Sequence, residues 1–177
     1  MKHKFTEGLL DNKKILEKLD IKKGYKVLDA GCGNGYMSKK FTKLVGNAGT
    51  IYALDTDKAF IEALKKETAK TSIIAVVGDI TSKTPLEDSS LDLIYLSTVF
   101  HIFKPAQIEG FIKEVKRLLR PGARLAVINI NKEETDFGPP MEMRLSHEEL
   151  RQKLPFVPKG LFDVGKYFYM QLFENSK

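Results

Sequence analysis

Short apolar stretches alternate along the chain with longer segments in which apolar residues recur every three or four positions. The short stretches are typical of buried strands, and we expect strands at residues 26–29, 50–54, 73–77, 91–95 and 124–130. The longer segments predict amphipathic helices, which we expect over residues 36–45, after the cap Asp57, and from Pro105 to about Leu119. Strands that alternate with helices predict βαβ units and a mostly parallel sheet.

Two regions depart from this alternation. Near the start, Asp11 or Asn12 is a suitable cap for a first helix, within an expected N-terminal helical segment of residues 1–25. Residues 131–146 contain a glycine followed by two prolines, which predicts a variable loop or insertion. This loop should end where Ser146 opens a capping box and a short helix.

The C-terminal stretch completes the expected sheet. Residues 162–173 are aromatic and alternating, with Gly165 in their midst, which predicts an antiparallel hairpin. The expected fold class is therefore α/β, a Rossmann-like, doubly wound, mostly parallel sheet of seven strands with an antiparallel hairpin at its C-terminal end. No change of composition marks a boundary, so we expect one domain over residues 1–177.

Composition and charge narrow the class of protein. The apolar and charged fractions, 42% and 29%, are those of an ordinary globular chain. The single cysteine excludes an internal disulfide and favours a reducing, cytoplasmic setting. Three scattered histidines indicate no zinc site, and no apolar run is long enough to span a membrane. The net charge of +6 is concentrated in a lysine-rich N-terminal segment, whose simplest interpretation is solvated helix faces.

Residues 27–35 carry the strongest chemical signal. A short strand ends on Asp29 and is followed by Gly31, Gly33 and Gly35 at alternate positions. Glycines in such a loop let the backbone approach a ligand closely. Because a helix is expected directly afterwards, we expect the loop to aim the unpaired N–H groups of that helix at an anionic group of a nucleotide-type ligand.

The glycine spacing narrows the choice of ligand. The dinucleotide fingerprint is Gly-x-Gly-x-x-Gly, whereas this loop has the tighter Gly-x-Gly-x-Gly pattern. An NAD-dependent oxidoreductase is therefore disfavoured. No Gly-Lys-Ser/Thr follows the loop, which excludes a P-loop.

Acidic residues end two further expected strands. Asp55 is placed to accept the hydroxyls of a ribose, although it could instead cap the next helix, for which Asp57 is better placed. Asp79 could accept an exocyclic amine while Ile80 offers an apolar face to a base, or it could form an ordinary Gly-Asp turn. Together with Asp29, these acids end three successive strands, at the sheet edge where ligands of open α/β folds bind.

Taken together, these motifs resemble those of a known family. The residues that carry the resemblance match, in order and spacing, the motifs of class I S-adenosylmethionine-dependent methyltransferases; they are 27–35, 54–55, 78–80, 91–95 and 119–125. Residues 85–92 also resemble the subgroup similar to ubiquinone/menaquinone-biosynthesis methyltransferases. The chain departs from the pattern at Ala123, where a second glycine is common, which affects a turn rather than a ligand contact.

The resemblance implies a cofactor and the residues that bind it. The cofactor is S-adenosylmethionine, and the residues expected to bind it are Asp29, Gly31, Cys32, Gly33, Gly35, Asp55, Thr56, Asp79, Ile80 and Ser97. The glycine loop would wrap the methionine portion, with Asp29 orienting its amino end. Asp55 would hold the ribose, and Asp79 with Ile80 would frame the adenine.

The reaction that these expectations imply is methyl transfer to an oxygen, nitrogen or carbon atom of a small molecule. Such a transfer needs alignment and exclusion of water, and it needs a general base only when the acceptor keeps its proton at neutral pH. His101 is the candidate base, although it could be a polar residue at a helix start. We expect Cys32 to pack within the loop rather than to act as a nucleophile.

Two other functions remain open at the level of sequence. An RNA methyltransferase would use the lysine-rich N-terminal segment as its docking surface. A cofactor-binding module without turnover would bind S-adenosylmethionine but would not transfer its methyl group to any acceptor. The motifs identify the methyl donor and leave the acceptor and the oligomeric state open.

Overall fold

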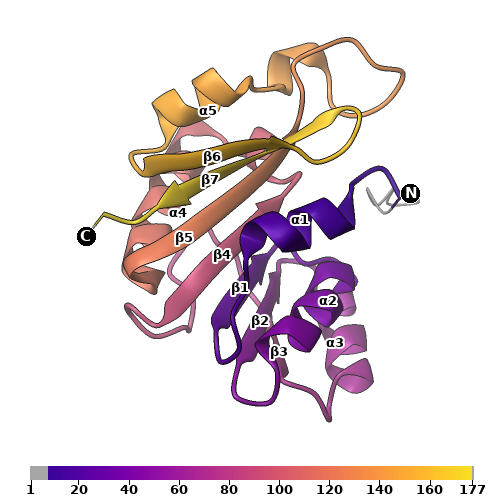
Figure 1. Ribbon diagram of the computed structural model, residues 1–177, viewed down its shortest axis with the longest axis vertical. Helices are drawn as coiled ribbons and strands as arrows, with labels where there is room; N and C mark the ends of the chain where they lie inside the picture. Colours follow the sequence, from indigo (N-terminus) through magenta and orange to yellow (C-terminus); the bar gives the residue numbers. More distant parts are fainter. Residues whose placement is uncertain (1–7, 177) are drawn as a thin grey trace.

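The computed structural model describes residues 8–176, which form an open, twisted sheet of seven strands with helices on both faces (Figure 1). The strands are β1 (Lys26–Ala30), β2 (Thr50–Asp55), β3 (Ile73–Val77), β4 (Leu91–Ser97), β5 (Leu119–Ile130), β6 (Val157–Asp163) and β7 (Phe168–Glu174). Their order is β3-β2-β1-β4-β5-β7-β6, with parallel pairing from β3 to β5 and antiparallel pairing of β5, β7 and β6. The expected fold class is confirmed.

Within residues 8–176, five α-helices and two short 3₁₀ turns lie before or between the strands. They are α1 (Asn12–Leu19), α2 (Tyr36–Val45), α3 (Lys58–Glu67), α4 (Pro105–Leu118), α5 (His147–Lys153), η1 (Phe100–Ile102) and η2 (Met141–Met143). The predicted caps are confirmed. Asp11 accepts the N–H of Lys14 at the start of α1, Asp57 accepts two N–H groups at the start of α3, and Ser146 opens a capping box.

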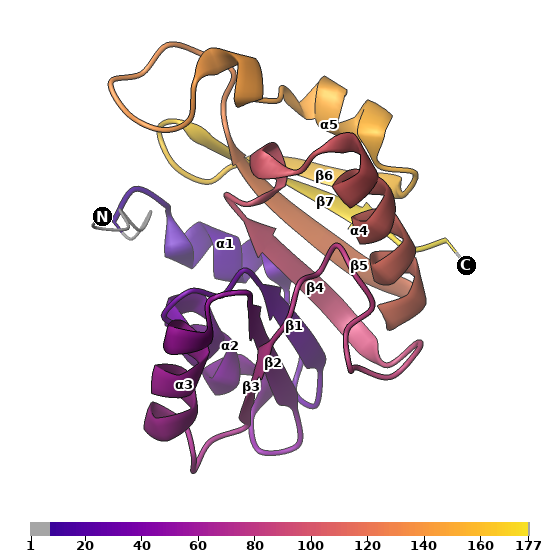
Figure 2. The same cartoon turned by 180° about the vertical axis from the view of Figure 1, so that it is seen from behind.

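Two separate apolar cores lie on the two faces of the sheet. On one face, α1, α2 and α3 pack against the odd-numbered residues of β1 to β4, such as Val27 and Ile51. On the other face, α4 and α5 cover even-numbered residues of β1 and β4 such as Leu28 and Ile94, and Figure 2 shows this side of the molecule. This division follows from the alternation of side chains along a strand. No helix within residues 8–176 is long and apolar enough to cross a bilayer.

The strand order reverses between β1 and β4, which are adjacent in the sheet. The chain leaves β1 toward α2 on one face and leaves β4 toward η1 and α4 on the other. The loops therefore diverge at the carboxyl ends of these two strands and leave space between them. Such a switch point is where ligands bind in doubly wound folds.

The structure differs from the sequence expectations near the ends of several elements. The sequence predicts that the helix runs to about Leu119. This is wrong for Leu119, because β5 begins there, immediately after α4, and Leu119 pairs with Leu91 of β4. β6 begins at Val157, before the predicted hairpin, because a proline and a glycine are tolerated in this edge strand. The loop predicted over residues 131–146 is present apart from η2, and it folds around the buried Arg144.

The chain between β3 and β4 contains no helix and is instead held against α4. Buried Glu114 accepts the backbone N–H and the hydroxyl of Thr84 at 2.8 and 2.7 Å. One turn earlier, Gly110 lies so close to this chain that a Cβ atom would be 2.0 Å from the Thr81 carbonyl oxygen. A helical glycine is therefore needed for close approach to the segment that follows Ile80.

We expect Gly110→Ala to destabilise the protein, although alanine is the better helix former. Overpacking costs about 1–3 kcal/mol, which outweighs a gain of about 1 kcal/mol in helix propensity. Urea unfolding measures the difference, with Glu109→Ala at an exposed position of the same helix as the control. An increase in stability of Gly110→Ala would contradict the close packing described above.

Candidate functional site

The glycine loop after β1 has a backbone that only glycine accommodates well. Gly31 and Gly35 both have φ of +73°. A Cβ atom on Gly31 would lie 2.7 Å from Val99, and one on Gly35 would lie 2.6 Å from Leu64. Both positions therefore need glycine for conformation and for space.

The end of β2 holds this loop in place. The N–H groups of Gly31 and Cys32 both donate to the carbonyl oxygen of Leu54, at 2.8 and 3.0 Å. The N–H of Gly33 donates to Oδ2 of Asp55 at 2.8 Å. The first half of the loop is thus bonded to protein atoms rather than open to a ligand.

The second half of the loop is bonded in the same way. The N–H of Gly35 donates to the carbonyl of Cys32 at 2.9 Å, and the N–H of Tyr36 donates to Asn34 Oδ1 at 3.0 Å. The expectation that the loop aims the unpaired N–H groups of the following helix at an anion is therefore wrong for Tyr36, the first residue of α2, because its N–H is bonded within the chain. The loop supplies shape rather than a cluster of donors for a phosphate.

Asp55 links the glycine loop to α3. Its Oδ2 accepts from Gly33, while its Oδ1 accepts the N–H of Asp57 at 2.9 Å. The helix cap itself is Asp57, as expected, since Asp57 Oδ1 accepts from Ala59 and Phe60. A carboxylate offers about four acceptor positions, so Asp55 retains capacity for a ligand.

Two adjoining cavities open at the carboxyl ends of the strands. The first, of about 450 Å³, is lined by Leu10, Asn12, Asp29, Gly31, Cys32, Gly33, Asn34, Tyr36, Met37, Asp55, Thr56, Asp57, Phe60, Tyr95, Ser97, Thr98 and Val99. The second, of about 330 Å³, is lined by Gly31, Leu54, Asp55, Thr56, Gly78, Asp79, Ile80, Val99, Ile102, Phe103 and Gln107. Four residues line both cavities, so the two form one divided site around Asp55.

The second cavity combines an acid with an apolar surface. Asp79 Oδ1 accepts the N–H and the hydroxyl of Thr81, at 2.8 and 2.7 Å, which fixes its side chain. Ile80 is buried, and Phe103 supplies a ring to the same lining. A flat aromatic ligand with a polar edge would suit this cavity.

Asp29 lies deep in the first cavity, with 3% of its surface exposed. Its Oδ2 accepts the hydroxyl of Ser38 in α2 at 2.6 Å. Burial raises its pKa to about 6, the negative charge of Asp55 adds to this rise, and the bonds from Ser38 oppose it. The charged form of Asp29 is therefore costly in the empty site.

The two cavities are acidic. Their lining includes four aspartates, Asp29, Asp55, Asp57 and Asp79, and no lysine or arginine among the described residues. No cluster of histidine, cysteine and acidic residues suited to a metal ion was found within residues 8–176. The charge of the site favours a cationic or neutral ligand over a phosphate.

The structure brings most of the predicted site residues together and leaves two out. Gly35 lines neither cavity and acts by packing α2 against Leu64 of α3. His101 lies in η1 and also lines neither cavity. Burial lowers the pKa of His101, which favours its neutral form. Burial raises the pKa of the Cys32 thiol, which keeps it protonated and suits a packing role.

Several lining residues were not predicted from the sequence. Tyr95 comes from β4, and Tyr36 accepts a hydrogen bond from Asn12 of α1 at 3.2 Å, across the first cavity. Thr98 follows β4 with φ of +56°, a strained conformation for a β-branched residue. A hydroxyl residue next to a predicted strand end, such as Thr98, is only a weak indication of a binding site. Contacts between distant elements, such as that of Tyr36 with Asn12, leave no local pattern in the sequence from which they could be predicted.

The raised pKa of Asp29 makes the stability of the empty protein depend on pH. Because the folded value of about 6 lies above the ordinary 3.8, the folded state holds this proton more tightly, and the free energy of unfolding falls as pH rises from about 4 to about 6. We expect ligand-free Asp29→Asn to be more stable than the wild type at pH 8, by on the order of 1–3 kcal/mol.

Urea unfolding at several pH values measures this difference, which should shrink toward zero near pH 4. Asp163→Asn, at an exposed position of β6, is the control and should follow the wild type throughout. A wild-type protein as stable as Asp29→Asn at pH 8 would show that the buried charge carries no cost.

Comparison with known proteins places this site in a family. Residues 28–127 match the methyltransferase domain family. A crystal structure of a SAM-dependent methyltransferase from Aquifex aeolicus is 30% identical, with a TM-score of 0.85 over 96% of this chain and 92% of that one. A methyltransferase from Mesorhizobium loti, described as dependent on S-adenosylmethionine, shares the fold at 13% identity, with a TM-score of 0.76 over 96% of this chain and 100% of that one.

A curated relative is the demethylmenaquinone methyltransferase of Staphylococcus aureus, 27% identical over 72% of this chain. The chain spans about half the length of that relative, 52%. The family match covers more than half of the chain and includes the end of β1, the glycine loop and β4. On this evidence of sequence, fold and site, the chain belongs to the methyltransferase domain family.

Proposed function

We propose that this protein is an S-adenosylmethionine-dependent methyltransferase that acts on an oxygen, nitrogen or carbon atom of a small molecule. The observation that carries this proposal is the divided site around Asp55, which has four aspartates and no lysine or arginine in its described lining. These aspartates would repel the negatively charged pyrophosphate of a dinucleotide. S-adenosylmethionine carries cationic ammonium and sulfonium groups and no phosphate, so it suits this charge.

The residues present fit the parts of this cofactor. Asp29 would attract the ammonium group, and the glycine loop would border the methionine portion with Cys32 and Ser97. Asp55 and Thr56, which line both cavities, would hold the ribose hydroxyls at their junction. Asp79 and Ile80 would hold the adenine by its amine and its ring face.

The protein's contribution to the reaction is positional. The bound cofactor supplies a methyl group on a positively charged sulfur, which leaves as a neutral thioether. The side chains of this protein then need to bind the donor, align an acceptor with the methyl group and exclude water. The proposed general base His101 stays a prediction: its lowered pKa keeps it able to accept a proton, although it lines neither cavity.

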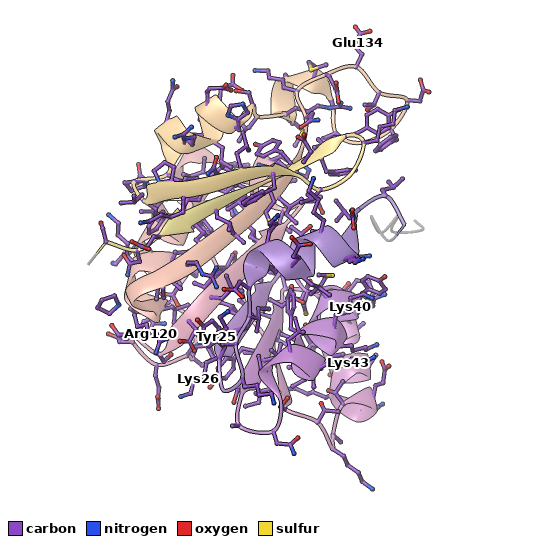
Figure 3. The ribbon with its side chains drawn as sticks, viewed as in Figure 1. Tyr25, Lys26, Lys40, Lys43, Arg120 and Glu134 are labelled. Carbon is purple, nitrogen blue, oxygen red and sulfur yellow. The ribbon has the colours of Figure 1, made fainter. Side chains whose placement is uncertain are left out.

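A small acceptor is favoured over RNA by the arrangement of basic residues. Lys18, Lys22 and Lys39 each pair with a nearby carboxylate. Lys40 and Lys43 project from α2, whereas Lys26 lies apart from them, at the start of β1 (Figure 3). Lys2 and Lys4, which belong to the predicted basic segment, lie outside the described residues. The small-molecule assignment is supported by the name of the Staphylococcus aureus relative.

Calorimetry tests the donor. We expect binding of S-adenosylmethionine and S-adenosylhomocysteine, and none of NAD. Asp55→Asn removes a charge while its amide oxygen can still hold one loop N–H, and it should lose on the order of 1.5–3 kcal/mol of cofactor binding. Asp57→Asn is the matched control, since asparagine preserves the helix cap, and its loss should be much smaller. Binding of NAD alone would contradict the proposal.

The acceptor is sought with a labelled methyl group. Transfer to fractions of small metabolites, and not to RNA, is the expected result. Labelled RNA with steep salt dependence would instead assign the protein to RNA methylation. Tight donor binding without transfer to either fraction would indicate a binding module without turnover.

A further inference from the structure

Tyr95 is a lining residue of the first cavity for which the proposed function has no role. It lies in the middle of β4, in register with Asp29 of the adjacent strand β1. Residues in register on neighbouring parallel strands point to the same face. Tyr95 and Asp29 are therefore neighbours, and both line the first cavity.

The ring of Tyr95 is held rigidly, whereas its hydroxyl is unpartnered. The ring packs edge-on against Phe41, with centroids 5.2 Å apart, and only 1% of the residue is exposed. The hydroxyl oxygen is buried and makes no hydrogen bond of good geometry to a described residue, although the Ser97 side chain lies near enough to interact with it. A phenylalanine would pack in the same space, so an unpaired hydroxyl at this position calls for a partner from outside the chain.

The surroundings of this hydroxyl define the partner's charge. Burial raises the pKa of the Tyr95 phenol, the nearby Ser97 side chain opposes the rise, and the charge of Asp29 adds to it. The phenol therefore stays neutral, and its oxygen can accept a hydrogen bond. Beside it stands the Asp29 carboxylate, which would repel an anion and attract a cation.

A primary ammonium group meets both requirements. It carries a positive charge for Asp29 and three N–H donors that can be shared between a carboxylate and a phenol oxygen. A water molecule would satisfy the hydroxyl but would leave the buried charge uncompensated. A carboxylate would satisfy neither group.

We propose that Tyr95 and Asp29 together bind the ammonium group of the methionine portion of the cofactor, with the Tyr95 oxygen accepting one of its N–H bonds. This inference rests on the proposed function and adds a residue to it. Tyr95 would orient the amino-acid end of the donor and select ligands that carry an amine. The ribose and adenine ends would be unaffected by it.

The test compares two ligands that differ only in the amine. They are S-adenosylhomocysteine and its analogue lacking the α-amino group, each titrated calorimetrically into the wild type and into Tyr95→Phe. We expect the variant to bind S-adenosylhomocysteine about ten to one hundred times more weakly, the scale of one hydrogen bond to a charged group. Its affinity for the deaminated analogue should match that of the wild type.

Tyr36→Phe is the matched control. It removes another tyrosine hydroxyl from the lining of the same cavity, one that already has Asn12 as its partner. This variant should change the affinities for the two ligands by the same factor. A selective loss of the amine-bearing ligand in Tyr95→Phe alone would support the proposal.

Thermal unfolding separates ligand binding from folding. Tyr95→Phe should unfold at the same temperature as the wild type or higher, because the hydroxyl makes no hydrogen bond of good geometry to a described residue. A lower unfolding temperature with equal loss of both ligands would assign the hydroxyl to the fold and overturn the inference. Unchanged discrimination between the ligands would overturn it while leaving the donor assignment intact. Absence of wild-type binding to S-adenosylhomocysteine would overturn both proposals.

Discussion

The hydrogen bonds between the end of β2 and the glycine loop after β1 are the constraint on which the site depends. Leu54 and Asp55 together hold three consecutive N–H groups of that loop. Asp55 also holds the start of α3 through Asp57. The path of the loop, the direction of α2 and the boundary between the two cavities all follow from these bonds. One carboxylate thus maintains the shape of the site while presenting its remaining acceptor positions to it.

The charge of the site is set by aspartates at positions where phosphate-binding folds have free backbone N–H donors. Because the loop N–H groups have protein partners, the cavities lack the anion-binding surface typical of phosphate sites. The aspartates at the strand ends then dominate the local field. Asp29 is the most extreme of them, since it is buried and, among the described residues, the hydroxyl of Ser38 donates to it. The arrangement selects a ligand by charge before any detailed contact is considered.

The sequence predicted the features that have local causes. The five parallel strands, the caps at Asp11 and Asp57 and the hairpin follow from periodicity and capping chemistry. Contacts between distant elements could not be predicted. Examples are the pairing of Tyr95 with Asp29 across two strands and the support of Asp29 by Ser38. The start of β6 was missed because its edge position tolerates residues that break strands elsewhere.

The buried charge of Asp29 links the survival of the protein to the supply of its ligand. Without a bound cation, the protein bears the cost of an ionised carboxylate in a buried position. A cation that binds only the folded chain removes this cost and raises the free energy of unfolding with the logarithm of its concentration. When the ligand is scarce, a larger fraction of molecules would unfold and become accessible to proteases. The abundance of the protein would then follow the supply of the ligand proposed for this site.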